Sequence, residues 1–128
     1  QNTTIGKNAL TSNIDGNYNS AVGLNALYSN TSGTSNTALG TYALTSNTTA
    51  SNNTAVGYQA LYSAVTGGFN VALGDHAGEG ITSGQFNVCV GSGAGYGVLT
   101  TGSSNVLIGI NANPANFSCT ITRAENKE

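Results

Sequence analysis

The chain has 128 residues and a mass of 12.8 kDa, enough for one domain with a modest core and too short for two ordinary enzymatic domains. Charged residues make up 6% of it, and three Lys plus Arg against five Asp plus Glu exclude general binding to nucleic acid or to an anionic membrane surface. No window approaches the roughly 18 consecutive apolar residues of a transmembrane helix, so we expect no insertion into a membrane. Asn, Gly, Thr and Ser supply 66 of the 128 residues, which leaves little material for a large apolar core.

A repeat of about 17 residues runs along residues 1–113. Three of its columns never vary, namely Asn at position 1, Gly at position 5 and Ala at position 8. The spacing of the first column is 17 residues five times and then 18, at Asn2, Asn19, Asn36, Asn53, Asn70, Asn87 and Asn105. Because the period carries β-branched residues and glycine turns without helical spacing, it predicts an all-β fold, a parallel β-solenoid of about seven 17-residue coils.

Stacking the coils gives each invariant column an expected role. The Asn column is expected to form a ladder in which each side-chain amide bonds the next. The Gly column marks a corner with positive φ, and the Ala column suits a narrow interior. Side chains alternate faces along a strand, so positions 1, 3 and 5 share one face and positions 2 and 4 share the other.

Position 4 is always bulky and aliphatic, and it predicts an oligomer interface. The column consists of Ile5, Val22, Leu39, Val56, Leu73, Val90 and Ile108. A continuous apolar row of this length is too large to leave in water. Burying each side chain fully is worth about 1.5–3 kcal/mol, so we expect partner chains to cover the row, with three chains around one axis as the preferred arrangement.

The repeat ends at Pro114, and residues 114–128 are expected to form a tail. Residues 117–122 alternate with period 2 and predict one more strand, which would serve as a cap or as a link between subunits. The first repeat begins at residue 2 without a cap, so we expect either more chain before it or a neighbouring subunit stacked head to tail.

The two cysteines match neither a zinc site nor a disulfide framework. Cys89 stands at an inward position 3, where a small apolar thiol fits without a further role. In an oxidising compartment a disulfide between Cys89 and Cys119 would pin the tail to the rod, and two free thiols are the equal alternative.

The repeat resembles known repeats once its core is written out. The core Ala-[Val/Leu/Ile]-Gly-x-x-Ala, as in residues 21–26 and 55–60, resembles the head repeats of trimeric autotransporter adhesins. The fuller string at residues 53–62 resembles repeats of phage and algal-virus tail-fibre-like proteins and of repetitive bacterial surface proteins. The resemblance covers residues 2–113. It implies a left-handed parallel β-roll with three chains per rod, extracellular and used for reach or attachment.

Two segments imitate catalytic or cofactor sites. Asp75, His76 and Glu79 are the kinds of groups that act in acid–base chemistry or bind metals. They occupy positions 6, 7 and 10, which vary between repeats, so a variable solvent-facing corner is the favoured interpretation. The glycine run at residues 91–97 resembles a nucleotide-binding loop, but no helix signal follows it. We therefore predict no enzymatic activity, no cofactor and no metal site.

The sequence contains candidate sites for attached glycans and candidate residues for binding glycans. N-glycosylation sequons occur at Asn30, Asn47, Asn2, Asn52 and Asn116. The first two are the better candidates, because both occupy position 12 of the polar segment that closes a coil, positions 10–17, which we call the return. They are expected to lie exposed, one above the other. A glycan-binding module would use aromatic rings as stacking platforms, but the candidates are spread along the rod, at Tyr28, Tyr58, Tyr62 and Tyr96.

The predicted function is mechanical. The chain is expected to be a structural subunit of an extracellular fibre or filament, a rigid self-associating rod with a role in surface attachment. The alternative is the glycan- or receptor-binding shaft of an adhesin or viral tail fibre. Ice binding is less favoured, because Val71 interrupts the column of Thr3, Thr37 and Thr54. The expected partners are copies of the chain itself, as a homotrimer or a head-to-tail filament, and cell-surface glycans. The expected location is extracellular or on the surface of a cell or virion.

Overall fold

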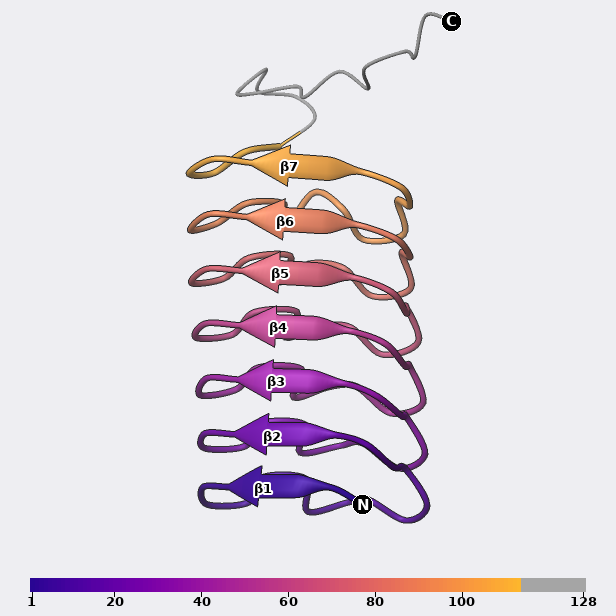
Figure 1. Cartoon of the computed structure of the whole chain (residues 1–128). Coiled ribbons are helices and arrows are strands. Elements are labelled where there is room, and N and C mark those ends of the chain that lie inside the picture. The colour runs from indigo at the N-terminus through magenta and orange to yellow at the C-terminus, as the bar shows by residue number, and fades with distance from the viewer. Residues whose placement is uncertain (114–128) are drawn as a thin grey trace, which may run out of the picture.

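A computed structural model describes residues 1–113, which form a stack of coils with one parallel sheet along its side (Figure 1). Neighbouring strands pair in sequence order and in register, so Thr4 lies beside Ala21 and Ala21 beside Ala38. The strands are β1 (Thr3–Ile5), β2 (Ser20–Val22), β3 (Thr37–Leu39), β4 (Thr54–Val56), β5 (Val71–Leu73), β6 (Val88–Val90) and β7 (Val106–Ile108). The described part of the chain contains no helix. The predicted all-β parallel solenoid is confirmed.

The coil is left-handed. In Figure 1 the strands run from right to left on the near side while the chain climbs from the N-terminus at the bottom. Connections between parallel strands are usually right-handed, because a twisted strand and a helix pack back onto the sheet in that sense. Here each connection is a series of turns that closes one coil, and that preference does not apply.

Backbone hydrogen bonds join the coils around most of their circumference, although only three residues of each coil are strand. On the side away from the sheet, the N–H of Leu27 donates to the carbonyl of Ala43 at 3.0 Å, and the N–H of Thr31 donates to the carbonyl of Thr48 at 2.8 Å. The same pattern repeats from coil to coil. Each coil therefore supplies the hydrogen-bond partners that the backbone of its neighbours needs.

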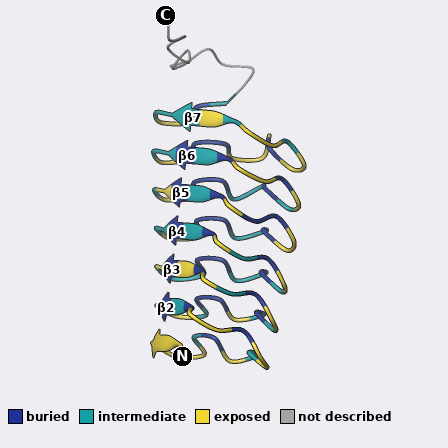
Figure 2. Ribbon diagram, turned by 45° about the vertical axis from the view of Figure 1, so that its right-hand side comes forward, coloured by how far each residue is buried: buried dark blue, intermediate teal, exposed yellow. Residues whose placement is uncertain are grey.

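The core is narrow and contains small side chains with one large residue in most coils. Alanines at positions 3 and 8 are buried from Ala21 to Ala112, as expected for the interior. Leu27, Leu44 and Leu61 at position 9 are fully buried and, with Ile81, are the largest side chains inside. Figure 2 shows buried residues recurring at the same places in successive coils.

The Gly column at position 5 lies at the corner after each strand. Its φ values run from 124° at Gly6 to 142° at Gly40, so the predicted positive φ is confirmed. A Cβ atom on Gly40 would collide with the carbonyl oxygen of Gly57 in the next coil. Close stacking of the backbone, together with the conformation, explains why only glycine is found in this column.

The Asn column at position 1 bonds mainly to backbone, so the predicted amide-to-amide ladder is wrong for most of it. The Oδ1 of Asn53 accepts the backbone N–H of Asn70 at 2.9 Å, and its Nδ2 donates to the carbonyl of Gly67 at 2.9 Å. The amide thus provides a partner for one backbone N–H of the next coil and for one backbone carbonyl of its own coil. Amide-to-amide bonds occur in this column only at its C-terminal end, from Asn87 and Asn105.

The residues at position 12 correct a second expectation. Asn30 and Asn47 do lie one above the other, but both are fully buried instead of exposed. The Nδ2 of Asn47 donates to the Oδ1 of Asn30 at 2.7 Å and to the carbonyl of Ala50 at 3.1 Å. This carbonyl at position 15 also accepts the Nδ2 of Asn36 at 2.8 Å, so the Asn columns at positions 1 and 12 meet there. A glycan on either side chain would break this ladder. The tail at 114–128, with its predicted strand, lies outside the described residues.

Candidate functional site

The outer face of the sheet carries the predicted apolar row. We call this surface the sheet face; it consists of the side chains at positions 2 and 4 of β1–β7. At position 4, 61% of Ile5, 46% of Leu39 and 38% of Leu73 is exposed, while Val22, Val56 and Val90 are half-buried. The predicted outward orientation is confirmed, and the row is an exposed apolar surface of the chain.

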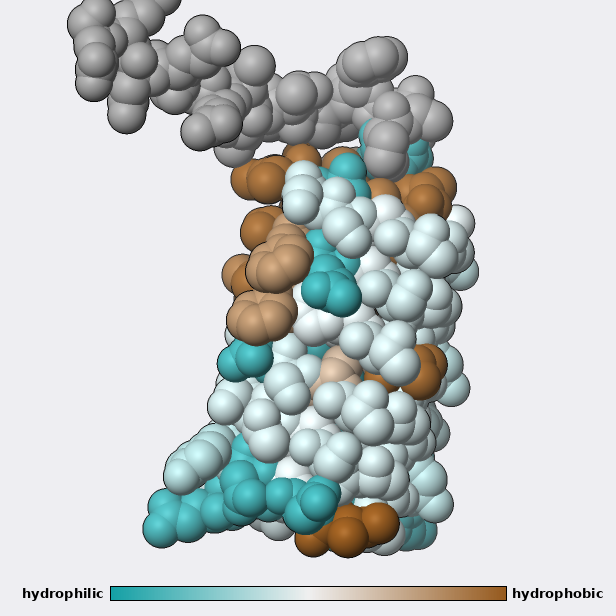
Figure 3. Space-filling model, turned by 90° about the vertical axis from the view of Figure 1, so that its right-hand side faces the viewer, coloured by the Kyte–Doolittle hydropathy of each residue, from teal (hydrophilic) through white to brown (hydrophobic). Residues whose placement is uncertain are grey.

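The apolar surface is wider in the C-terminal half. Position 2 changes there from Thr or Ser to Val71, Val88 and Val106, which pair in register. Beside them the rings of Phe69 and Phe86 stack at 5.0 Å with an interplanar angle of 13°, and more than half of each is exposed. Figure 3 shows the apolar side chains gathered along one edge of that half. The repeat alignment places both phenylalanines at position 17, but no hydrophobic periodicity at that position indicates an exposed surface.

A second surface follows the turn after the strands, where positions 6, 7 and 10 meet. Its five rings make edge-to-face contacts from coil to coil and form what we call the aromatic strip. Centroid distances are 6.2 and 6.4 Å from Tyr42 to Tyr58 and Tyr62, 5.3 Å from Tyr58 to His76, and 5.9 Å from His76 to Tyr96. Tyrosines expected to be spread out are therefore joined into one row, with Tyr28 outside it.

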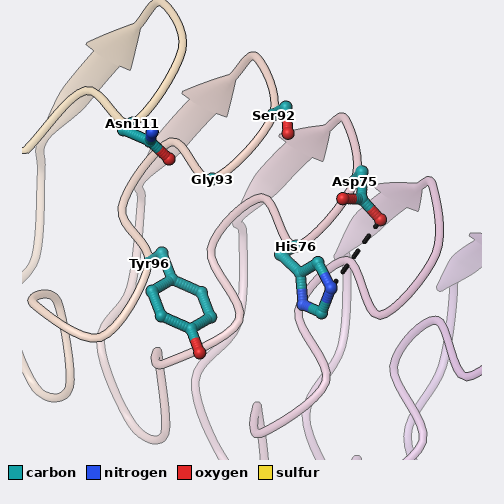
Figure 4. A pocket seen from close by; sticks show the side chains of 6 residues that line it. All are labelled: Asp75, His76, Ser92, Gly93, Tyr96 and Asn111. Carbon is teal, nitrogen blue, oxygen red and sulfur yellow. Dashed lines mark ion pairs between the residues drawn. The ribbon is translucent and has the colours of Figure 1, made fainter.

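A shallow hollow of about 280 Å³ lies at the C-terminal end of the aromatic strip (Figure 4). It is lined by Asp75, His76, Ser92, Gly93, Tyr96 and Asn111. Gly93 stands at position 7, between His76 in the coil before it and Asn111 in the coil after it. Because Gly93 has no side chain and Ser92 has a short one, the surface is open at this point.

His76 is held between two carboxylates at the edge of the hollow. Its Nδ1 lies 2.5 Å from Oε2 of Glu79, and its Nε2 lies 3.8 Å from Oδ1 of Asp75. The backbone N–H of His76 donates to the carbonyl of Tyr58 at 2.8 Å, which joins the backbone at this corner to the coil before it. Of the three side chains, 55% of Asp75 is exposed, against 32% of His76 and 22% of Glu79. The corner faces solvent as expected, but His76 and Glu79 are half-buried.

These carboxylates do not converge on one point, since they lie at opposite nitrogens of the imidazole. Among residues 1–113 no group of three or more His, Cys, Asp or Glu is placed to hold a metal ion. The glycine run at 91–97 forms turns, and no helix follows it within the described residues. The arrangement can orient the imidazole and accept hydrogen bonds from a ligand in the hollow.

Cys89 occupies the inward position predicted for it. The residue is fully buried as a free thiol, and burial raises its pKa to about 11. The thiol therefore stays protonated at neutral pH and is a poor nucleophile. Cys119 lies outside the described residues, and the disulfide between the two stays a prediction.

The remaining sequons differ in how free their side chains are. Asn2 is exposed, but its Nδ2 donates to the carbonyl of Gly16 and its Oδ1 accepts the N–H of Asn19, both at 2.8 Å. Asn52 is exposed in a turn with φ of 62°, where its backbone N–H donates to the carbonyl of Thr34. Asn116 lies outside the described residues. Asn52 is thus the most accessible of the described sequons.

Comparison with known proteins assigns no family. No family model, curated protein or solved structure matches the chain. In residues 1–113 there is also no helix of the length and hydropathy needed to cross a membrane.

Proposed function

We propose that the chain is a structural subunit of an extracellular fibre or filament, a rigid rod that associates with copies of itself. The observation that carries this proposal is the exposed aliphatic row of the sheet face, which follows the whole described length of the rod. The coils behind it are hydrogen-bonded to one another, so the row is presented on a stiff support.

Energetics favour self-association through the sheet face. Neighbouring coils are about 4.8 Å apart, so the seven position-4 side chains form a line roughly 30 Å long. Full burial of one such side chain is worth about 1.5–3 kcal/mol, and a large part of that remains to be gained by those still 38–61% exposed. No charged residue stands at positions 2 or 4 of any strand, so a partner desolvates no charge there. Three chains around one axis would bring their rows together.

The resemblance to adhesin heads and tail-fibre-like repeats supports the same proposal and an extracellular location, and it is consistent with the left-handed coil. The glycan-binding alternative gains support from the aromatic strip. Ice binding gains none, because Ser20 and Val71 stand in the same register column as Thr3, Thr37 and Thr54.

Sedimentation velocity and electron microscopy of the wild type and of a Leu39→Thr/Leu73→Thr variant test this proposal. Threonine already occurs on the sheet face, so the fold should be retained in circular dichroism. The wild type is expected to form trimers or longer fibres, and the variant to be mainly monomeric.

Ile14→Thr is the matched control for this experiment. Ile14 is 81% exposed on the return, away from the sheet face, and its replacement should leave association unchanged. A wild type that stays monomeric up to the highest soluble concentration would overturn the proposal. Equal association of the wild type and the double variant would do the same.

A further inference from the structure

We propose that the hollow beside Gly93 is a binding site for a neutral sugar residue, with the ring of Tyr96 as its stacking platform. The proposal rests on the corner of the coils and does not depend on self-association through the sheet face.

The shape of the hollow arises from one coil that differs from its neighbours. Positions 6 and 7 hold Tyr58 and Gln59 in the fourth coil and Asp75 and His76 in the fifth, but Ser92 and Gly93 in the sixth. The resulting space of about 280 Å³ is at the small end of ligand sites and suits one monosaccharide unit. It is open on one side, so a longer glycan would extend from it along the surface.

The hollow is lined by polar groups that suit the hydroxyls of a sugar and by an aromatic ring that suits its C–H face. Figure 4 shows Asp75, Ser92 and Asn111 on three successive turns, with the rings of His76 and Tyr96 below them. A carboxylate, a hydroxyl and a carboxamide together accept and donate hydrogen bonds, as sugar hydroxyls require. The C–H face of a pyranose packs on an aromatic ring, and Tyr96 is 56% exposed and available for this contact.

Electrostatics select a neutral ligand over an anionic one. Asp75 and Glu79 both lie at this corner, and His76 is paired with them. A sialylated, sulfated or phosphorylated sugar would place negative charge beside these carboxylates. A metal ion is not favoured either, because the carboxylates lie on opposite sides of the imidazole ring.

The platform is held in place before a ligand arrives. His76 is bonded to Glu79 and contacts the rings of Tyr58 and Tyr96 edge to face, which restricts Tyr96 on one side. A ring that is already ordered loses little conformational freedom on binding, and this favours affinity.

An NMR titration of the ¹⁵N-labelled protein with methyl β-D-glucopyranoside, methyl β-D-galactopyranoside and N-acetylglucosamine tests the proposal. At least one of these probes is expected to shift the amide signals of Ser92, Gly93 and Asn111, with a Kd of about 1 mM. Tyr96→Ala should weaken binding about tenfold or more, and Tyr96→Phe should retain it. Tyr28→Ala is the matched control, because Tyr28 occupies the same position 10 outside the aromatic strip.

A second variant, Gly93→Asn, fills the hollow. Gly93 has a φ of 67°, which asparagine tolerates, and Asn8, Asn25 and Asn111 occupy the same column with similar φ values. A Cβ there would come closer than 3.0 Å only to Oδ1 of Asn111, the end of a side chain that can move. The variant should fold normally and lose the sugar-induced shifts. Absence of shifts with all three probes, equal binding by Gly93→Asn, or stronger binding of sialyllactose would each overturn the proposal.

Discussion

At the scale of single residues, asparagine is the connector between coils. Each buried side chain at position 1 accepts a backbone N–H from the next coil and donates to the carbonyl that closes its own. No other uncharged side chain of this size offers a strong acceptor and a donor in one plane. Leaving a buried backbone group without its partner costs about 1–3 kcal/mol, which explains why this column does not vary.

Replacing Asn53 with alanine should therefore cost about 3 kcal/mol or more in the free energy of unfolding, because the N–H of Asn70 and the carbonyl of Gly67 both lose their partner. Urea denaturation measures the loss. The control is Asn52→Ser at the exposed neighbouring position, where Ser35 and Ser104 occupy the same column with positive φ, and it should change stability by less than about 0.5 kcal/mol. Equal losses in both variants would show that the side-chain bonds do not matter.

At the scale of one coil, the core is filled in two ways. Leu10, Leu27, Leu44 and Leu61 fill it from position 9, although their φ values of 51–55° are unfavourable for a leucine. Such a conformation costs about 1–2 kcal/mol, which is less than the gain from burying the side chain. In the fifth coil position 9 is Gly78, and Ile81 at position 12 fills the space instead. In the sixth coil position 9 is Gly95, and the buried side chain of Leu99 fills the space beside it.

Exchanging one arrangement for the other tests this account. Ile81→Ala alone should cost about 3 kcal/mol by leaving a cavity. Gly78→Leu alone should cost about 2 kcal/mol, because its new side chain meets Ile81 and Leu61. The double variant reproduces the Leu61 and Ala64 pair of the fourth coil. Its loss should be smaller than the sum of the single losses by at least about 1 kcal/mol, measured in the same denaturation assay. Strict additivity would show that the two positions do not share one space.

At the scale of the whole molecule, the rod is a sum of coils and of contacts between neighbours. Every sheet contact joins adjacent strands, and equal positions lie in register from one coil to the next. Stability in such a stack depends on each repeat and on its two interfaces. The length can therefore change by whole coils without a change of fold.

Deletion of residues 36–52, one complete coil, should give a folded rod that is shorter by about 4.8 Å. Ser35 then precedes Asn53, and every column remains in register. The control deletion of residues 36–44 removes about half a coil, so Ser35 would precede Thr45 and no column would continue across the junction; it should unfold at a clearly lower temperature. Circular dichroism and small-angle scattering measure both effects. Equal melting temperatures for the two deletions would contradict the dependence on register.

The sequence alone determined the period, the parallel in-register stack, the positive φ of the Gly column, the small interior and the outward aliphatic row. These features follow from the stacking of equal repeats. Each coil is related to the next by a shift along the rod axis, so residues of one column form a line whichever path the backbone takes within a coil. Only the tertiary structure decided what happens in the return, where no alternation marks inside and outside. The turns there direct the side chains of Asn30 and Asn47 inward. They also let Ile81 fill the core of the fifth coil where Leu61 fills that of the fourth, and they place His76 and Tyr96 together beside Gly93. Those outcomes depend on how the backbone turns within one coil, and the repeat period in the sequence contains no information about those turns.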